Sequence, residues 1–210
     1  MYRLLLAGFI FLNCNGSATR ATGDDWIPLF DGKSLDGWKS STDNPSTFRA
    51  DSGMIIVHGP RAHLFYMGEV MNHDFKDFEL KVELMTRPGA NSGIYFHTAY
   101  QADGWPSKGY EVQVNNSQSD WRRSGSLYGI ADIREVYVRD NEWYTEHIIV
   151  KDKKITVKIN DRVVVEYTEP EAVEKREGRK DRRLSSGTFA LQGHDPGSVI
   201  YYRQVLVKPL

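Results

Sequence analysis

The stretch Gly109-Tyr-Glu-Val-Gln-Val-Asn-Asn116 decides the fold, because it alternates apolar and polar side chains with the period of a β-strand. The apolar side chains are predicted to pack inward: Tyr110, Val112 and Val114. The polar side chains then share the opposite face: Glu111, Gln113 and Asn115. A polar row on a sheet fits a sugar-binding cleft, and it equally fits a solvated sheet face, so its meaning depends on the rest of the chain.

Short strand-like runs alternate with turn signals along most of the chain, at the spacing of an antiparallel sandwich. The predicted strands are Met54–Val57, Phe75–Thr86, Ser92–Ala99, Tyr110–Asn115, Glu135–Arg139, Thr145–Lys151, Lys154–Ile159, Arg162–Thr168, Thr188–Gly193 and Val199–Lys208. Phe78–Leu84 alternates without error, which favours a half-buried antiparallel strand. Asn160-Asp161 predicts a two-residue hairpin turn. The sequence therefore predicts an all-β sandwich.

The beginning of the chain is typical of an export signal. Arg3 precedes the apolar run Leu4–Leu12, which is too short to span a membrane. We expect residues 1–21 to be a signal peptide and residues 22–210 to form a single domain. In the alternative, Cys14, the only cysteine, is lipidated as the first mature residue. Either way we expect an exported protein, periplasmic or extracellular, or anchored as a lipoprotein.

Charge gives little indication of a macromolecular partner. The formal net charge of -1 offers no electrostatic reason to expect nucleic acid or an anionic membrane surface. The charged stretch Glu169–Arg183 intersperses acids and bases between two predicted strands. We therefore interpret it as a solvated loop or short surface helix rather than an anion-binding patch.

An ordered set of motifs resembles the 3-keto-disaccharide hydrolase domain family. The motifs are Trp26-Ile-Pro-Leu-Phe-Asp-Gly-Lys-Ser-Leu-Asp-Gly-Trp38, Gly89-Ala-Asn-Ser-Gly-Ile-Tyr-Phe-His97, Gly109-Tyr-Glu-Val-Gln113, Ser124-Gly-Ser-Leu-Tyr-Gly129, Asn141-Glu-Trp143, Val157-Lys-Ile-Asn160, Ala190-Leu-Gln-Gly-His194, Tyr202-Arg203 and Lys208-Pro-Leu210. The resemblance implies a secreted bacterial protein with a concanavalin A-like jelly-roll sandwich of two antiparallel sheets.

The chain departs from the family pattern at a few positions. Family members usually carry an Arg where His97 stands, an Asp near Asn115 or Asn116, an Asn where Tyr144 stands and a Gly where Asp161 stands. The missing Asp matters most: if its carboxylate is the essential base of the family, this chain is impaired or specialised.

The resemblance implies cleavage of 3-keto-glycosides, and carbonyl chemistry indicates how. A ketone at C3 acidifies the proton on C2, so a base can remove it and the glycosidic oxygen on C1 can leave by β-elimination. Addition of water to the resulting glycal completes a net hydrolysis. Such an enzyme needs a base, an acid and an enolate stabiliser. A separate sugar 3-oxidoreductase would have to supply the substrate.

The polar residues of the motifs suit these roles. Glu111 is the predicted base, and His194 is the second predicted catalytic residue, able to act as acid, as base or as a metal ligand. The predicted substrate-binding residues are Asn91, His97, Trp105, Gln113, Tyr128, Gln192 and Arg203. Arg203 would stabilise the enolate or clamp a hydroxyl pair. Each residue also has a structural interpretation. Glu111 and Gln113 could lie on a wetted sheet face, and His194 could be a turn residue bonded to backbone. Arg203 could form a structural ion pair, and Trp105 could pack in the core.

No close-spaced ligand motif indicates a firm metal site. Glu111, His97 and His194 would nevertheless form a mixed oxygen and nitrogen set able to hold a divalent cation.

Two other functions compete with the 3-keto-glycoside enzyme. A non-catalytic carbohydrate-binding module of the same fold would use the polar face and aromatics for binding alone. A retaining glucanase would need two suitably spaced acids, and the strand offers only Glu111 of the expected set.

Overall fold

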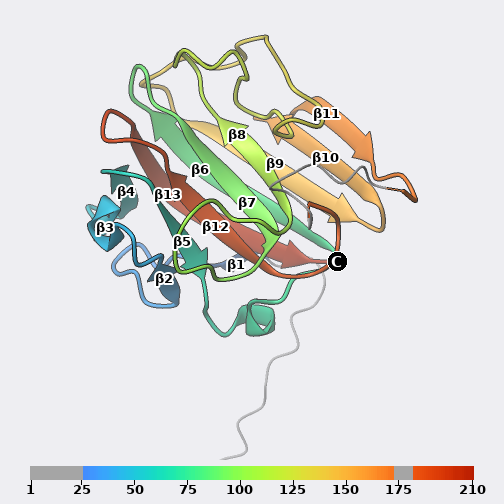
Figure 1. Ribbon diagram of the computed structural model, residues 1–210, viewed down its shortest axis with the longest axis horizontal. Coiled ribbons are helices and arrows are strands. Elements are labelled where there is room, and N and C mark those ends of the chain that lie inside the picture. Colours follow the sequence, from blue (N-terminus) through green and yellow to red (C-terminus); the bar gives the residue numbers. More distant parts are fainter. Residues whose placement is uncertain (1–25, 173–181) are drawn as a thin grey trace, which may run out of the picture.

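The computed structural model describes residues 26–172 and 182–210, which form two antiparallel β-sheets (Figure 1). The larger sheet contains β1 (Ile27–Pro28), β3 (Phe48–Asp51), β4 (Met54–His58), β6 (Phe78–Thr86), β9 (Tyr144–Lys151), β10 (Lys154–Ile159), β11 (Arg162–Thr168) and β13 (Val199–Pro209). The smaller sheet contains β2 (Trp38–Ser40), β5 (Ala62–Tyr66), β7 (Ser92–Thr98), β8 (Tyr110–Val114) and β12 (Thr188–Gly193). Two short 3-10 helices, Pro45–Thr47 and Val70–His73, lie between strands.

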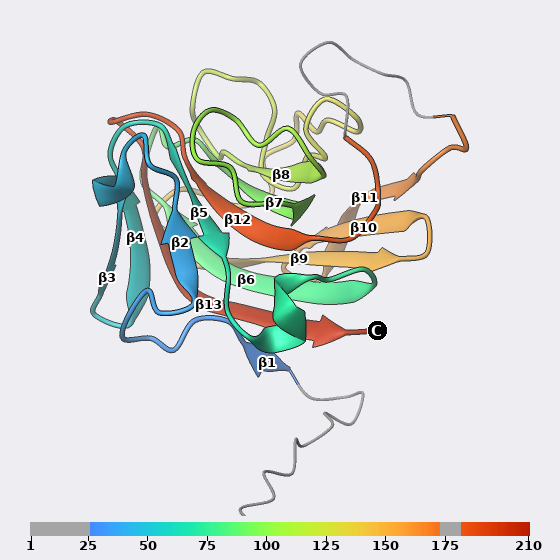
Figure 2. The ribbon, with the colours of Figure 1, turned by 60° about the horizontal axis from the view of Figure 1, so that its bottom comes forward.

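The two sheets stack as layers with the apolar core between them (Figure 2). The larger sheet has the order β11-β10-β9-β6-β13-β4-β3, with β1 added beside β13, and the smaller has the order β2-β5-β12-β7-β8. β6 alternates strictly between buried and half-buried residues, as its sequence predicts. The predicted all-β sandwich of two antiparallel sheets is confirmed.

Most predicted strands form within a few residues of their expected bounds. The exception is Glu135–Arg139, which is wrong: this segment is irregular and Val136 is half exposed. The apolar and polar residues of Glu135–Arg139 do alternate, but this segment pairs with no strand of either sheet in the described part of the chain. The hairpin turn between β10 and β11 is confirmed, because Ile159 pairs with Arg162 and Asn160 has a φ of 49°.

The predicted signal peptide, residues 173–181 of the charged stretch and Cys14 lie outside the described residues. No helix in 26–172 or 182–210 is long and apolar enough to cross a membrane.

β8 is buried on both faces. Tyr110, Val112 and Val114 join the core between the sheets, as predicted. Two long connections arch over the other face: residues 99–109 between β7 and β8, and residues 115–143 between β8 and β9 (Figure 2). The polar side of β8 is therefore enclosed rather than wetted.

Side-chain hydrogen bonds link the two layers. The Tyr202 hydroxyl on β13 lies 2.9 Å from Ser92 Oγ on β7. The Tyr144 hydroxyl on β9 lies 3.0 Å from Ser124 Oγ, which also donates to Asn116 Oδ1 at 2.7 Å. These contacts attach β7 and the 115–143 connection to the larger sheet.

Glu146 on β9 is a buried carboxyl group with an unusual environment. It is fully buried, and neither carboxyl oxygen has a hydrogen-bond partner among the described residues. Burial raises the pKa of Glu146 well above its usual value.

We predict that Glu146→Gln stabilises the fold at pH 7 and above. The unfolded chain ionises this carboxyl above pH 4.5 while the folded chain keeps it protonated, so the wild type loses about 1.4 kcal/mol per pH unit over that window. Denaturant unfolding between pH 4.5 and 8 measures the effect. The exposed Glu166→Gln on β11 is the matched control, and equal pH dependence in wild type and Glu146→Gln would contradict the prediction.

Candidate active site

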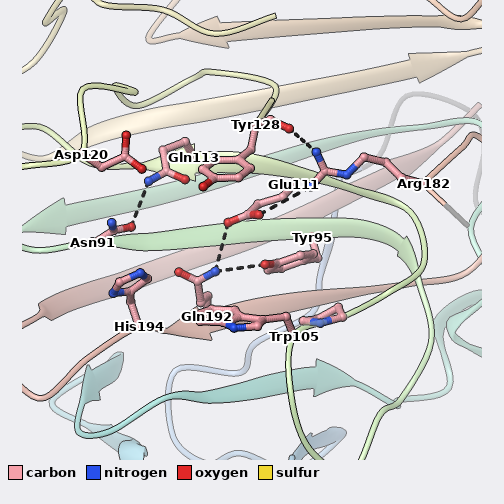
Figure 3. A pocket seen from close by; sticks show the side chains of 11 residues that line it. Asn91, Tyr95, Trp105, Glu111, Gln113, Asp120, Tyr128, Arg182, Gln192 and His194 are labelled. Carbon is pink, nitrogen blue, oxygen red and sulfur yellow. Dashed lines mark hydrogen bonds and ion pairs between the residues drawn. The ribbon is translucent and has the colours of Figure 1, made fainter. Parts of the chain in front are cut away.

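A cavity of about 290 Å³ lies on the enclosed face of the smaller sheet, beneath the two long connections (Figure 3). Its walls come from β7, β8 and β12, from both connections, and from the segment that leads into β12. The lining residues are Asn91, Tyr95, Trp105, Pro106, Glu111, Gln113, Asp120, Tyr128, Arg182, Gln192 and His194.

Glu111 of β8 projects into this cavity and is only 6% exposed. Its Oε1 accepts a hydrogen bond from Gln192 Nε2 at 3.0 Å, and the same amide donates to the Tyr95 hydroxyl at 3.0 Å. Burial first, then the charge of Glu111 and a hydrogen bond with it, raise the pKa of Tyr95 well above its usual value. Tyr95 therefore remains a neutral donor beside the carboxylate.

Gly93 of β7 makes room for the Glu111 side chain. The two strands pair antiparallel, with Tyr95 opposite Glu111 and Gly93 opposite Gln113. A Cβ atom at Gly93 would lie 2.5 Å from Glu111 Oε1. The absence of a side chain at this strand position therefore fixes where the carboxylate sits.

Arg182 is the cation of the cavity. Its side chain is buried, its Nη1 donates to Tyr128 O, and its Nη2 lies 3.9 Å from Glu111 Oε2 (Figure 3). The interpretation of Glu169–Arg183 as solvated is wrong for this residue. No sequence signal distinguishes Arg182 from the other cations of the stretch, because its burial depends on Glu111 and on the carbonyl of a distant loop.

A second polar chain borders the cavity. Gln113 Nε2 donates to Asn91 Oδ1 at 2.9 Å, and the Asn91 N–H donates to Ser198 Oγ at 2.9 Å. Asp195 Oδ2 accepts from Ser198 Oγ and lies 2.8 Å from His194 Nδ1. Burial opposes ionisation of Asp195, but its hydrogen bonds with His194 and Ser198 lower its pKa overall. His194 thus has an ionised partner at Nδ1.

Two aromatic side chains on the connections complete the walls. Trp105 is 45% exposed, and its ring centroid lies 5.6 Å from that of His194. Tyr128 lies between two guanidinium groups, with Arg122 at 4.7 Å and Arg182 at 5.8 Å from its ring centroid. Both residues were predicted to bind substrate, and both line the cavity.

Sequence reasoning overlooked Asp120, which brings a second carboxylate to the cavity. Its Oδ1 accepts from the Arg122 N–H at 3.0 Å and lies 3.3 Å from Arg122 Nη1. Asp120 belongs to the 115–143 connection, so no strand pattern indicates where it points.

His97 does not line the cavity, contrary to expectation. It follows Tyr95 by two residues, but its φ of 54° breaks the strand alternation. Its ring lies against Phe78 and is held at Nε2 by Lys76 O at 2.8 Å, while Nδ1 accepts from the Ser185 N–H.

Arg203 also lies elsewhere. It belongs to β13 of the larger sheet, where its guanidinium group makes two 2.6 Å hydrogen bonds to Glu83 and lies over the Trp143 ring. Arg203 therefore forms a structural ion pair on the larger sheet, and it does not line the cavity in which it was predicted to bind substrate.

The three predicted cation ligands are not brought together, because His97 lies outside the cavity that Glu111 and His194 share. Within residues 26–172 and 182–210, no group of three His, Cys, Asp or Glu side chains is placed to hold a metal ion.

His63 on β5 was assigned no role from the sequence, yet it lies beside the cavity. It is fully buried, and neither ring nitrogen has a hydrogen-bond partner in the described part of the chain. Its ring contacts Tyr95 and Trp105, each at 5.5 Å between centroids. Burial, the main cause, lowers the pKa of His63 to about 4.

The fold and the cavity define a β-sandwich of the lectin and glucanase type with a polar, carboxylate-containing site on one sheet. A family model described as the 3-keto-alpha-glucoside-1,2-lyase-like domain matches residues 25–208. The chain belongs to this family, which confirms the resemblance found in the sequence.

Relatives in sequence and structure agree with this assignment. A 3-keto-disaccharide hydrolase of Bacteroides thetaiotaomicron is 28% identical over 170 residues, which are 69% of this chain and 59% of that protein. The chain thus spans about three-fifths of the length of this curated relative. A provisionally named glycosyl hydrolase from Parabacteroides distasonis has a TM-score of 0.73 at 21% identity, covering 88% of this chain and 94% of the other.

A glucanase structure shares the fold as well. A non-specific endo-beta-1,3(4)-glucanase superposes with a TM-score of 0.52 at 12% identity, covering 88% of this chain and 87% of that one. At such identity the likeness shows the sandwich architecture alone.

We predict that His63 makes stability fall at acid pH. The folded chain keeps this imidazole neutral down to about pH 4, whereas the unfolded chain protonates it near pH 6.5. The wild type should therefore lose about 3 kcal/mol between these pH values, and His63→Phe should not show this loss. Denaturant unfolding at intervals from pH 7.5 to 4 measures it. The exposed His58→Phe on β4 is the control, and parallel curves for wild type and His63→Phe would contradict the prediction.

Proposed function

We propose that this protein cleaves 3-keto-glycosides, including 3-keto-disaccharides, by removing the C2 proton, eliminating the C1 oxygen and hydrating the product. The observation that carries the proposal is the buried Glu111 carboxylate, which is held between Gln192, Tyr95 and Arg182 inside a polar cavity. Family membership and the name of the Bacteroides relative support the substrate class.

Glu111 acts as the base in this proposal. Its carboxylate accepts the proton from C2, and the electrons of the broken C–H bond form the enolate of the C3 ketone. Gln192 and Tyr95 fix the orientation of the carboxylate, and Gly93 leaves the space that it occupies. A base fixed in this way transfers a proton without first rearranging its surroundings.

Arg182 takes the electrostatic role that the sequence had suggested for Arg203. Its guanidinium group is buried in the cavity wall and lies within 3.9 Å of Glu111, so it can stabilise negative charge that moves from the carboxylate to the enolate oxygen. The low exposure of the site strengthens this interaction relative to water.

His194 acts as the acid. As the enolate collapses, a C1–C2 double bond forms, the bond from C1 to the glycosidic oxygen breaks, and that oxygen takes a proton from His194. Asp195 stabilises the cationic imidazolium by its contact at Nδ1, which leaves Nε2 to face the leaving group. Water then adds to C1 as hydroxyl while the neutral His194 takes its other proton, and Glu111 returns the proton to C2, so both side chains regain their starting protonation states.

The reaction implies a partner enzyme and a location. A separate sugar 3-oxidoreductase would have to supply the ketone, because the proposed elimination starts from a sugar that is already oxidised at C3. We further propose that the protein is exported, on the strength of the signal-like residues 1–21.

Two other functions, a carbohydrate-binding module and a glucanase, could use the same cavity. A carbohydrate-binding module would use the same cavity without turnover. An ordinary glucanase would need a second carboxylate, and Asp120 does bring one to the cavity, although Arg122 holds it by an ion pair and a backbone hydrogen bond.

The deciding experiment measures product release from a panel of 3-keto-glycosides and their unoxidised parents. We expect wild type to cleave only the oxidised sugars, and Glu111→Gln to lose about 10²–10⁴-fold in kcat, because the amide cannot accept the C2 proton. Glu166→Gln, on the exposed face of β11, is the matched control. A chelator-treated sample tests the divalent cation.

Each other result favours a different function. Cleavage of the unoxidised parents would support the glucanase, and saturable binding without turnover would support the binding module. Full activity of Glu111→Gln would remove Glu111 as the base.

We predict that Gly93→Ala impairs catalysis without unfolding the protein. The added methyl group would meet Glu111 Oε1 at 2.5 Å, so the carboxylate must move away from Gln192 and the bound sugar. We expect kcat to fall about 10²-fold, as for other small displacements of a catalytic group. Circular dichroism and the melting temperature check folding, and unchanged kcat would contradict the stated position of Glu111.

A further inference from the structure

The polar row on the enclosed sheet face extends beyond the cavity. Gln113 pairs with Gly93, Leu191 of β12 pairs with Ile94, and Gln192 pairs with His63. These registers place Gln113, Gln192 and His63 along one line across β8, β7, β12 and β5. Gln113 and Gln192 line the cavity, whereas His63 lies at the end of the same line beneath Trp105.

Two polar groups in this row lack the partners that buried groups require. Both nitrogens of His63 are without a hydrogen bond in the described part of the chain, and so is Gln192 Oε1, although both residues are at most 2% exposed. Such groups are rare in folded proteins and cost free energy unless a ligand or water satisfies them. In Figure 3 the amide of Gln192 turns its oxygen toward His194, away from Glu111 and Tyr95.

Trp105 covers His63 with few attachments of its own. The indole is 45% exposed and contacts the rings of His63 and His194 edge-on or tilted, with the Arg61 guanidinium group at 5.6 Å from its ring centroid. Its backbone is held by a 2.9 Å hydrogen bond from Gln101 Nε2 within the same connection. Within the described part of the chain, Trp105 belongs to neither the hydrophobic core nor the residues packed against it, so the indole can move aside without unpacking the sandwich.

The cavity is small for the proposed substrate. Its volume of about 290 Å³ lies just below the roughly 300–1,000 Å³ of typical small-molecule sites, while a disaccharide brings two rings. One ring must lie over Glu111 for its C2 proton to be removed. The second ring needs space that continues from the cavity.

We propose that Trp105 covers a second sugar subsite, whose floor is His63 and the Oε1 edge of Gln192, and that the leaving sugar of a 3-keto-disaccharide binds there when the indole moves aside. The neutral imidazole offers one donor and one acceptor, and Gln192 Oε1 offers a further acceptor, which together match two or three sugar hydroxyls. The indole face then stacks on the ring that replaced it. This subsite rests on the proposed function for the identity of its sugar.

The first test compares a two-ring with a one-ring substrate. We expect His63→Phe, which keeps an aromatic ring in place, to raise KM for a 3-keto-disaccharide about 3–10-fold through lost hydrogen bonds. KM for methyl 3-keto-glucoside and both kcat values should stay within about twofold. His58→Phe is the control. An equal rise for both substrates, or none for either, would overturn the subsite.

The second test needs no catalysis, so its failure is separable from failure of the proposed function. Ring-nitrogen NMR of His63 in the wild type is recorded with an unoxidised glucose disaccharide and with methyl glucoside. We expect only the disaccharide to shift the His63 resonances. No shift from the disaccharide, or equal shifts from both sugars, would overturn the subsite even if the enzyme proves active.

The third test concerns the cover itself. Trp105→Ala should let water reach the imidazole and so raise the pKa of His63 from about 4 toward its ordinary 6.5. A pH titration of the same ring-nitrogen NMR signals measures this pKa. Trp121→Ala, which removes an exposed indole that does not contact His63, is the matched control. An unchanged pKa in Trp105→Ala would show that the indole is not the cover.

Discussion

The burial of a carboxylate on a strand that is covered on both faces is the constraint from which the site follows. An ionised Glu111 without partners would cost several kcal/mol in this position. The next two strands of the sheet each compensate for this burial: β7 contributes Tyr95 and the space left by Gly93, and β12 contributes Gln192. Arg182 adds the opposite charge from outside the sheet. Groups that make burial tolerable are the same groups that orient a base, so stability and catalysis share one arrangement.

The roof over this carboxylate has two parts with different attachments. The 115–143 connection is tied to the core, because Ser124 bonds to Tyr144 and to Asn116, and Asn116 donates to Thr86 Oγ1 at 2.9 Å. The 99–109 connection is also hydrogen-bonded, from Thr42 to Ala102 O and from Lys108 to Ser186 O, but the contacts of its Trp105 ring with the described residues are aromatic and cationic. A wall that stays fixed around Tyr128 and a cover that moves at Trp105 would let sugars enter without loosening the base.

The period of two in the sequence was sufficient to predict the sandwich and the polar face of β8. The same period puts Gln192 and His194, which are two residues apart, on one side of their strand, and both line the cavity. The same rule failed at His97, where a positive φ turns the ring toward the core. Alternation predicts faces only while the backbone stays extended.

Other residues could not be placed from periodicity at all. Arg203 lies where the register of β13 shifts, between Tyr202 and Gln204, and its own strand does not indicate which of the two sheets it joins. Arg182 and Asp120 come from irregular segments, whose direction depends on contacts with residues far along the chain. His63 could be recognised only once Trp105 was seen to cover it.

Asn115, which directly follows β8, holds the first part of the 115–143 connection in shape. Asn115 Nδ2 donates to Asp120 O and Arg122 O, both at 2.9 Å, while its Oδ1 accepts from the Gln118 N–H. An Asp at this position would turn carboxylate oxygens toward two carbonyl oxygens and could not hold the loop in this shape. The Asn115 amide therefore stabilises the loop conformation that brings the Asp120 carboxylate to the cavity.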